Sequence, residues 1–491
     1  MSQMSQTLQS QLGGSRPLAR VSALLVAGIL TGYVIAAHGF TQALFFIFAL
    51  SALTAFLAAR YPWLAVVSPL VIFIVMGIGV SSGLNIGGAS INLADVLLLP
   101  ALAPTIAKVL AGRRDLSYPS VPALLIFVWL VLATALGVYY GNSLSLVRNE
   151  LHVLFFIVLA YFWAIVELRT PRDVWLASIA LIAATAVAGF KSIYISFFVS
   201  HFSEGYSQLW QASTTASREL GGQRTILNGA DTFFVLSMPL IASFALFFRE
   251  RRYIAWLSAA FVLTLYGLFI SLTRTNWATV LVAILLVMLL GMRTAGRQVV
   301  RIGVAVLLIC ILALAVSSMI TFGGNTYDLG ELMSRRLEPN PYTGAGNLNY
   351  RIMESKALID QAQEHLVLGN GLGASFDFLE FRGATSVNWA HNGHLWLLLK
   401  SGLAGMAVFY LGIAATCWQL IRMSFHAGQR TLSAISLGFG IALASLMIMT
   451  LLVNRISNME GAYFIGLAVA LPQIISRINR EVPVSAIQEA S

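Results

Sequence analysis

The chain has 491 residues, of which 58% are hydrophobic and only 10% are charged. Soluble domains carry roughly 25% charged residues, so this composition excludes an ordinary soluble protein and predicts a multi-spanning membrane protein. The net charge of +10 would suggest a nucleic-acid partner in a soluble protein. Cytoplasmic loops of membrane proteins are rich in lysine and arginine, so we expect membrane lipids as partners and no nucleic acid.

The apolar runs predict an all-α polytopic protein of about 14 transmembrane helices. The run Val21–Ala37 follows a polar tail and is expected to be an uncleaved signal anchor rather than a cleavable signal peptide. The predicted spans are 21–37, 41–59, 63–80, 94–112, 121–139, 150–167, 173–199, 227–248, 254–271, 276–292, 300–320, 403–421, 431–453 and 461–476.

The distribution of basic residues predicts the orientation of these spans. With the N-terminus in the cytoplasm, every connection expected on that side carries arginine or lysine, whereas most short external turns do not. The expected organisation is a cytoplasmic tail (1–20), a transmembrane bundle of about 11 spans (21–320), a large external loop (321–402), three further spans (403–476) and a cytoplasmic tail (477–491).

Several arginines run against this bias, because they lie on or near the external face: Arg148, Arg218, Arg224, Arg274, Arg335, Arg336, Arg351, Arg382 and Arg455. A guanidinium binds oxyanions bidentately and stays charged, so the set predicts an anionic ligand such as a diphosphate-linked lipid. The alternative for any one arginine is a pair with an acidic residue, Glu354 or Asp377 among them, or contact with lipid headgroups.

Two of these arginines are the sharpest candidates. Arg274 lies in the segment SLTRTNWA (271–278), where one span ends and the next begins; a charge at that depth indicates function or snorkelling to the surface. Arg351 opens a predicted loop helix, 349–368, which the segment GNGLG (369–373) ends as a turn. Arg351 either points back to the membrane or is a surface charge of that helix.

The stretch WAHNGHLWLLLKSGLAGM (389–406) is the main candidate for chemistry. If it is helical, His391 and His394 share a face, because they are three residues apart. His391 is a candidate general base, with a purely structural role as the alternative. Asn392 and His394 are candidates to orient it or to bind sugar hydroxyls. Trp389 would stack on a sugar or serve in an interfacial aromatic belt.

No Walker-type phosphate loop and no cluster of His, Asp and Glu with metal-ligand spacing occurs in the sequence. Cys310 and Cys417 fall within apolar runs and read as small buried residues rather than ligands. We therefore expect neither a metal nor another cofactor, and we expect chemistry that depends on arginine and histidine.

These motifs resemble the bacterial O-antigen ligase and O-antigen polymerase superfamily. That family shows His-Asn, nine residues and Gly-x-x-Gly, which here are His391-Asn392, residues 393–401, Gly402 and Gly405. Its loop helix begins with arginine and ends in a Pro-x-x-Gly-x-Gly turn; Arg351, Gly369, Gly371 and Gly373 match, although the usual proline is missing. Its Ser-x-Ser/Thr-Arg segment matches Ser271, Thr273 and Arg274.

The resemblance implies a GT-C-like bundle in the bacterial inner membrane, with both termini cytoplasmic and a periplasmic active site. It implies inverting transfer of a glycan from undecaprenyl diphosphate to a sugar hydroxyl, with His391, Arg274 and Arg351 as catalytic residues. We expect Arg218, Arg224, Arg148, Asn392, His394, Arg382 and Trp389 to bind substrate. Other polysaccharide assembly proteins are further candidate partners.

Within the superfamily we favour a polymerase of O-antigen or exopolysaccharide repeat units. The alternative is a ligase that passes the glycan to lipid A-core. A flippase of lipid-linked oligosaccharide is a further alternative, which predicts two related halves and short loops on both sides. A peptidoglycan glycosyltransferase of the shape-and-division type would use an external carboxylate, and none stands in a comparable sequence setting.

Overall fold

The structure, a computed structural model, describes most of the chain from residue 56 onward. The described residues are 56–57, 59–76, 83–86, 89–114, 118–198, 215–220, 223–228, 231–248, 250–270, 274–296, 346–380, 383–426 and 429–481. The spans predicted at 21–37 and 300–320, and most of the span at 41–59, lie outside these ranges.

Helices make up most of the described chain. They are α4 (Pro62–Met76), α5 (Leu93–Leu110), α6 (Val121–Tyr139), α7 (Leu144–Glu167), α8 (Pro171–Phe198), α10 (Asp231–Phe247), α11 (Arg251–Ile270), α12 (Arg274–Ala295), α15 (Gly346–Gln363), α16 (Gly393–His426), α17 (Arg430–Thr450) and α18 (Met459–Glu481). Among the described residues, 8 helices are long and apolar enough to cross a membrane. A multi-pass membrane protein is therefore confirmed, whereas the predicted count of about 14 spans is not.

Within the described residues, three antiparallel hairpins join the helices, although we expected helices alone. They are β1–β2 (Gly83–Ile86 with Ala89–Asn92), β3–β4 (Thr215–Leu220 with Gln223–Asn228) and β5–β6 (Phe376–Glu380 with Gly383–Val387). Strand β5 follows the GNGLG segment, although we expected no strand there. Each hairpin pairs only with itself, so these strands add local backbone bonds in connections without forming a larger sheet.

Burial separates the inner helices from those that face lipid. Helices α10, α17 and α18 are buried on almost every side, and α18 approaches α7 so closely that a Cβ at Gly466 would lie 2.1 Å from Ile157 O. Helices α6 and α12 instead expose large apolar side chains at helical spacing, namely Leu124, Val128 and Val131 on α6 and Leu281, Leu285 and Leu289 on α12. Such exposed apolar stripes suit contact with lipid tails.

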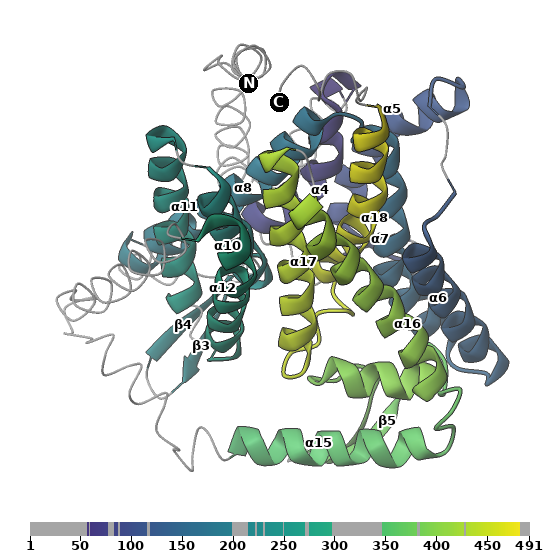
Figure 1. Ribbon diagram of the computed structural model, residues 1–491. Coiled ribbons are helices and arrows are strands. Elements are labelled where there is room, and N and C mark those ends of the chain that lie inside the picture. The colour runs from purple at the N-terminus through teal and green to yellow at the C-terminus, as the bar shows by residue number, and fades with distance from the viewer. Residues whose placement is uncertain are drawn as a thin grey trace.

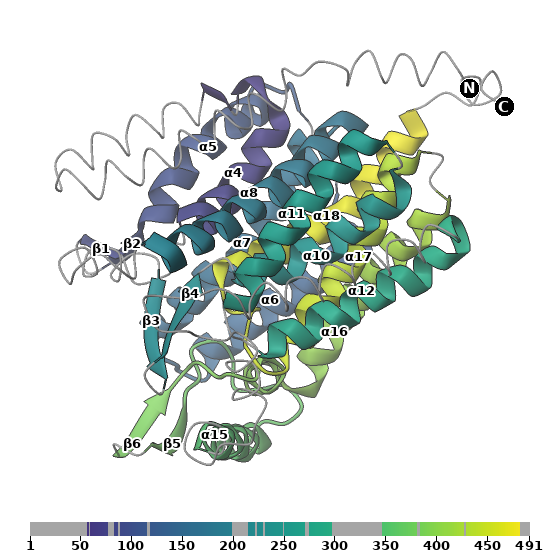
Figure 2. The same ribbon diagram turned by 90° about the vertical axis from the view of Figure 1, so that its left-hand side faces the viewer.

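Helix α15 lies across one end of the bundle, together with β5–β6 and the beginning of α16 (Figures 1 and 2). We call this end the loop face. Helix α16 breaks at Gly402, whose φ of 60° and ψ of −172° are not helical. The break divides α16 into a short helix, residues 393–401, on the loop face and a long helix, residues 403–426, in the bundle. The long helix begins where the predicted span 403–421 begins.

Candidate functional site

The break at Gly402 is held by residues 366–373, which we call the glycine loop. Breaking a helix leaves carbonyl and N–H groups without their helical partners, and such groups are costly away from water. Leu399 O and Lys400 O accept hydrogen bonds from Asn370 N (2.8 Å) and Gly371 N (2.9 Å). On the far side of the break, the N–H groups of residues 403 and 404 donate to the carbonyls of residues 366 and 367 at 2.8 and 3.0 Å. The glycine loop thus satisfies both ends of the break.

Glycine is required in this loop because the backbones approach so closely. Gly369, Gly371 and Gly373 have φ values of 80°, 77° and 77°, a region that residues with a Cβ rarely adopt. A Cβ at Gly369 would lie 2.4 Å from Gly402 N, and one at Gly371 would lie 2.0 Å from Gly137 N in α6. The turn predicted at 369–373 is therefore also the joint between α6, the loop and α16.

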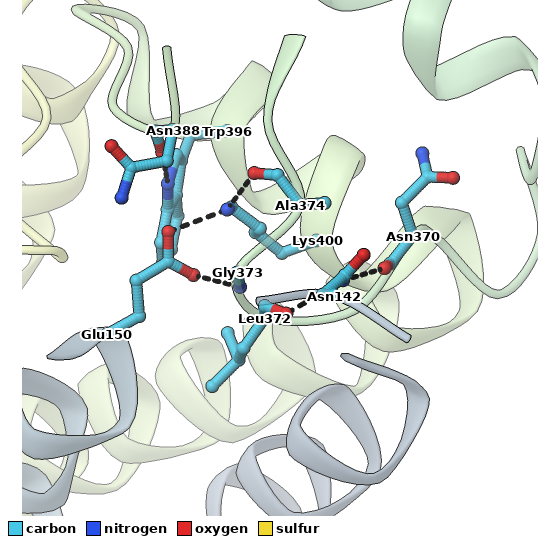
Figure 3. Close-up of polar contacts among 9 residues, drawn as sticks. All are labelled: Asn142, Glu150, Asn370, Leu372, Gly373, Ala374, Asn388, Trp396 and Lys400. Atoms are coloured by element: carbon cyan, nitrogen blue, oxygen red, sulfur yellow. Dashed lines mark hydrogen bonds and ion pairs between the residues drawn. The ribbon is translucent and has the colours of Figure 1, made fainter. Parts of the chain in front are cut away.

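A buried ion pair fixes the short helix to α7 (Figure 3). Lys400 Nζ lies 2.6 Å from Glu150 Oε1, and the lysine also donates to Ala374 O. Glu150 Oε2 accepts a hydrogen bond from Gly373 N at 2.8 Å. The side chain of Lys400 is fully buried and that of Glu150 is 9% exposed, so each charge depends on the other.

The sequence contained a signal for this pair that we did not use. Lys400 interrupts the apolar run that follows Trp396, and a charge in such a run indicates a specific partner. Between the spans predicted at 121–139 and 150–167, the chain is already helical from Leu144, and Glu150 reaches the glycine loop through Gly373. Asn142, just before this helix, donates to the carbonyls of Asn370 (2.8 Å) and Leu372 (2.9 Å).

His391 is held against α15 by a single carboxylate. Its Nδ1 lies 3.1 Å from Glu354 Oε1, and its backbone N–H donates to Glu354 Oε2 at 3.2 Å. Glu354 is buried, whereas the side chain of His391 is 30% exposed. The Trp389 ring packs edge-on against the imidazole with centroids 4.6 Å apart. The predicted base is thus a partly accessible imidazole on a buried carboxylate.

His391 and His394 do not share a helix face, contrary to our expectation. The helix begins at Gly393, because Asn392 Oδ1 accepts from the N–H groups of His394 (3.0 Å) and Leu395 (3.1 Å) and so caps it. His391 therefore precedes the helix and turns to α15. His394 Nε2 donates to Met447 O at 3.1 Å, and its Nδ1 accepts from the Tyr410 hydroxyl, so this histidine joins α16 to α17.

An open groove of about 790 Å³ runs between α15 and the beginning of α12. Its polar lining comes from Arg351, Lys356, Ser355 and Thr275, and its apolar lining from Ile352, Ile359, Ala278 and Leu452. Arg351 Nη1 donates to Leu452 O at 3.2 Å, which fixes the guanidinium at the edge of the groove. A helix N-terminus carries partial positive charge, so α12 adds to the positive potential of the two cations.

The other predicted arginines are placed as follows. Arg274 begins α12, immediately before Thr275 of the groove. Arg148 is exposed near the beginning of α7. Arg218 and Arg224 lie on β3 and β4, opposite Thr225 and Glu219 in the hairpin register. Arg335, Arg336 and Arg382 lie outside the described residues.

Arg455 fits the alternative that we gave for the external arginines, namely a pair with an acidic residue. It forms an ion pair with Asp231, the first residue of α10, rather than lining the groove between α15 and α12. Within the described ranges, no three His, Cys, Asp or Glu side chains lie close enough to hold a metal ion. With Arg455 paired elsewhere, the groove can attract an anion through Arg351, Lys356 and the N-terminus of α12.

The fold and the site together define a multi-pass membrane protein with a cationic, histidine-containing site at one end of its bundle. Residues 259–410 match the protein-family model described as O-antigen ligase. The matched segment contains Arg274, Arg351, His391 and Gly402, so the match confirms the resemblance to the O-antigen ligase and polymerase superfamily. It also supports a membrane enzyme that transfers glycosyl groups.

Other comparisons add little. One solved structure, described as "Structural coordination of polymerization and crosslinking by a peptidoglycan synthase complex", aligns at 12% identity over 75% of this chain and 100% of that chain. Its TM-score of 0.41 does not establish a shared fold. No curated protein matches the chain.

Proposed function

We propose that the protein transfers a glycan from undecaprenyl diphosphate to an acceptor sugar hydroxyl at the periplasmic face of the bacterial inner membrane. One observation carries the proposal: Arg351, which lines the groove, and Glu354, which holds His391, are one turn apart on the same helix. The arginine proposed to bind phosphate and the carboxylate that holds the candidate base therefore share one rigid element. We favour repeat-unit polymerisation, with ligation to lipid A-core as the alternative.

In the proposed reaction, the His391 imidazole takes the proton of the acceptor hydroxyl as its oxygen attacks the anomeric carbon. The bond from that carbon to the diphosphate oxygen breaks, and undecaprenyl diphosphate leaves with the electron pair. A single displacement inverts the anomeric carbon. Arg351, Arg274 and the N-terminus of α12 would stabilise the negative charge that develops on the leaving diphosphate, which is usually the largest catalytic contribution.

The lining of the groove also suits a lipid-linked donor. Its two cations, Arg351 and Lys356, are flanked by Ile352, Ile359 and Leu452, so one surface offers charge for a diphosphate and apolar contact for the first isoprene units. We propose that the loop face is periplasmic, because the arginine-rich ends expected in the cytoplasm lie at the other ends of the spans.

The test is glycan transfer in proteoliposomes, with undecaprenyl-diphosphate glycan as donor and both acceptor classes, in the presence of a chelator. We expect product from the wild type and none from His391→Ala, Arg351→Ala or Arg274→Ala. Arg422→Ala is the matched control, because this exposed arginine lies near the other end of α16. The acceptor that is used decides between polymerase and ligase.

Active His391→Ala would contradict the assignment of the base, and loss of product with chelator would contradict metal-independent chemistry. If the wild type makes no product but moves the donor between leaflets, the flippase alternative replaces the enzyme.

A further inference from the structure

The Glu354 carboxylate contacts His391 twice, once at its backbone N–H and once at its imidazole ring. The carboxylate accepts the His391 backbone N–H at 3.2 Å and faces the ring Nδ1 at 3.1 Å. We propose that Glu354 is a positioning residue that fixes the tautomer and the orientation of the His391 imidazole. This inference rests on the proposed function, in which His391 accepts the proton of the acceptor sugar.

The chemistry of the contact determines the tautomer. An ionised carboxylate only accepts hydrogen bonds, so Nδ1 must carry the proton in the neutral ring. The basic lone pair is then on Nε2, the nitrogen on the opposite edge of the ring from α15. The second contact, through the backbone of the same residue, prevents the ring and its main chain from shifting independently. Proton transfer to Nε2 would create an imidazolium that the carboxylate stabilises.

Burial argues that this contact has more than a packing role. Glu354 is 2% exposed, and a buried carboxylate is costly unless donors compensate it. Within the described residues, the hydrogen bonds to this carboxylate come from His391 alone. Arg351, one turn away on α15, donates to Leu452 O instead. The buried carboxylate of Glu354 is therefore paired with the His391 imidazole and not with Arg351, the nearby cation on the same helix.

The experiment compares Glu354→Gln and Glu354→Asp with the wild-type protein in the glycan-transfer assay. The amide of Glu354→Gln can present either its carbonyl or its NH₂ group to Nδ1, so it no longer imposes one tautomer. We expect kcat to fall by roughly 10- to 100-fold, part of the contribution of a positioned acid–base group, with KM for the donor unchanged. Glu354→Asp, which retains the charge, should recover part of kcat.

A second readout does not depend on activity. Histidine ring ¹⁵N signals of the detergent-solubilised protein, assigned with His391→Gln, should report the Nδ1–H tautomer in the wild type and a mixture in Glu354→Gln. The matched control is Glu167→Gln, which removes an equally buried carboxylate that pairs with Lys108 at the other end of α7.

The outcomes separate the two proposals. Unchanged kcat and unchanged ring signals in Glu354→Gln would overturn the inference while the function stands. Equal losses in Glu354→Gln and Glu167→Gln, each with a lower unfolding temperature, would reduce Glu354 to a structural residue and also overturn it. If the wild type transfers no glycan, the proposed function fails, and the ring signals still decide whether Glu354 sets the tautomer.

Discussion

Lys400 Nζ lies 2.6 Å from Glu150 Oε1, although the two residues are 250 positions apart in the chain. The pair joins the short helix that follows His391 to the first turns of α7, and Glu150 also holds the glycine loop through Gly373 N. The pair therefore connects α7 to the short helix and the glycine loop, beside the two hydrogen bonds that Asn142 donates to the same loop.

Lys400→Met should destabilise the protein strongly, because it leaves Glu150 buried without its cation. Removing one partner of a buried pair typically costs about 3–5 kcal/mol. The loss should appear as a lower unfolding temperature in detergent. Lys400→Met combined with Glu150→Gln should be less destabilised than the sum of the two single variants, since no uncompensated charge remains. Additive losses would show that the two side chains do not interact.

Gly371→Ala should prevent proper assembly of the loop face, whereas Gly141→Ala should be tolerated. Both glycines have positive φ, 77° and 71°, so each substitution carries strain of about 1–2 kcal/mol. Only Gly371→Ala adds a collision, with Gly137 N at 2.0 Å, because nothing lies within 4 Å of a Cβ at Gly141. The yield of monodisperse protein and its unfolding temperature test this difference. Similar behaviour of the two variants would mean that the close approach is not required.

Asn392→Ala should cost about 1 kcal/mol of stability, because it removes the cap of the short helix. Asn392→Ser, which retains a capping oxygen, should recover most of this loss. The same variants test whether Asn392 binds sugar: a residue that only caps affects transfer in proportion to stability. A large increase of KM for the acceptor in Asn392→Ser, at wild-type stability, would instead assign it to substrate binding.

Arg351→Lys should impair donor binding even though the charge is retained. A lysine cannot reproduce the bidentate fork, and a hydrogen bond to a charged group contributes about 1.5–3 kcal/mol, so KM for the donor should rise roughly 10- to 100-fold. Lys356→Met should have a smaller effect, because this lysine is exposed on the groove wall. Arg422→Lys serves as the control. An unchanged KM in Arg351→Lys would remove this arginine from the diphosphate site.

Hydropathy located several of the described helices, because a membrane span is a run of consecutive apolar residues, although the count of about 14 spans is not confirmed. The spans predicted at 121–139 and 431–453 correspond closely to α6 and α17. The beginning of the long part of α16 was also predicted, since the expected span 403–421 starts directly after Gly402, but the short helix before the break was not. Hairpins were missed because their strands are short and pair only locally.

The polar contacts of the site could not be read from the sequence in the same way. Arg351 and His391 were recognisable as candidates from motif spacing, but Glu354 was only one of several acids that might have paired with an arginine. Glu354 pairs with His391 because α15 lies across the end of the bundle, and a local sequence pattern does not predict that placement. His394 and Asn392 lie in the same motif as His391, yet Asn392 caps the helix that begins at Gly393 and His394 contacts Met447 of α17.

Because α16 breaks at Gly402, the number of residues in the short helix 393–401 sets the distance from His391 to the bundle. One end of residues 393–401 is anchored by the glycine loop, and the other carries the histidine to Glu354. One residue added to this helix would lengthen it by about 1.5 Å and rotate the histidine by about 100° about the axis. An insertion or deletion within this segment would therefore turn His391 away from α15, even if it left the apolar character of the helix unchanged.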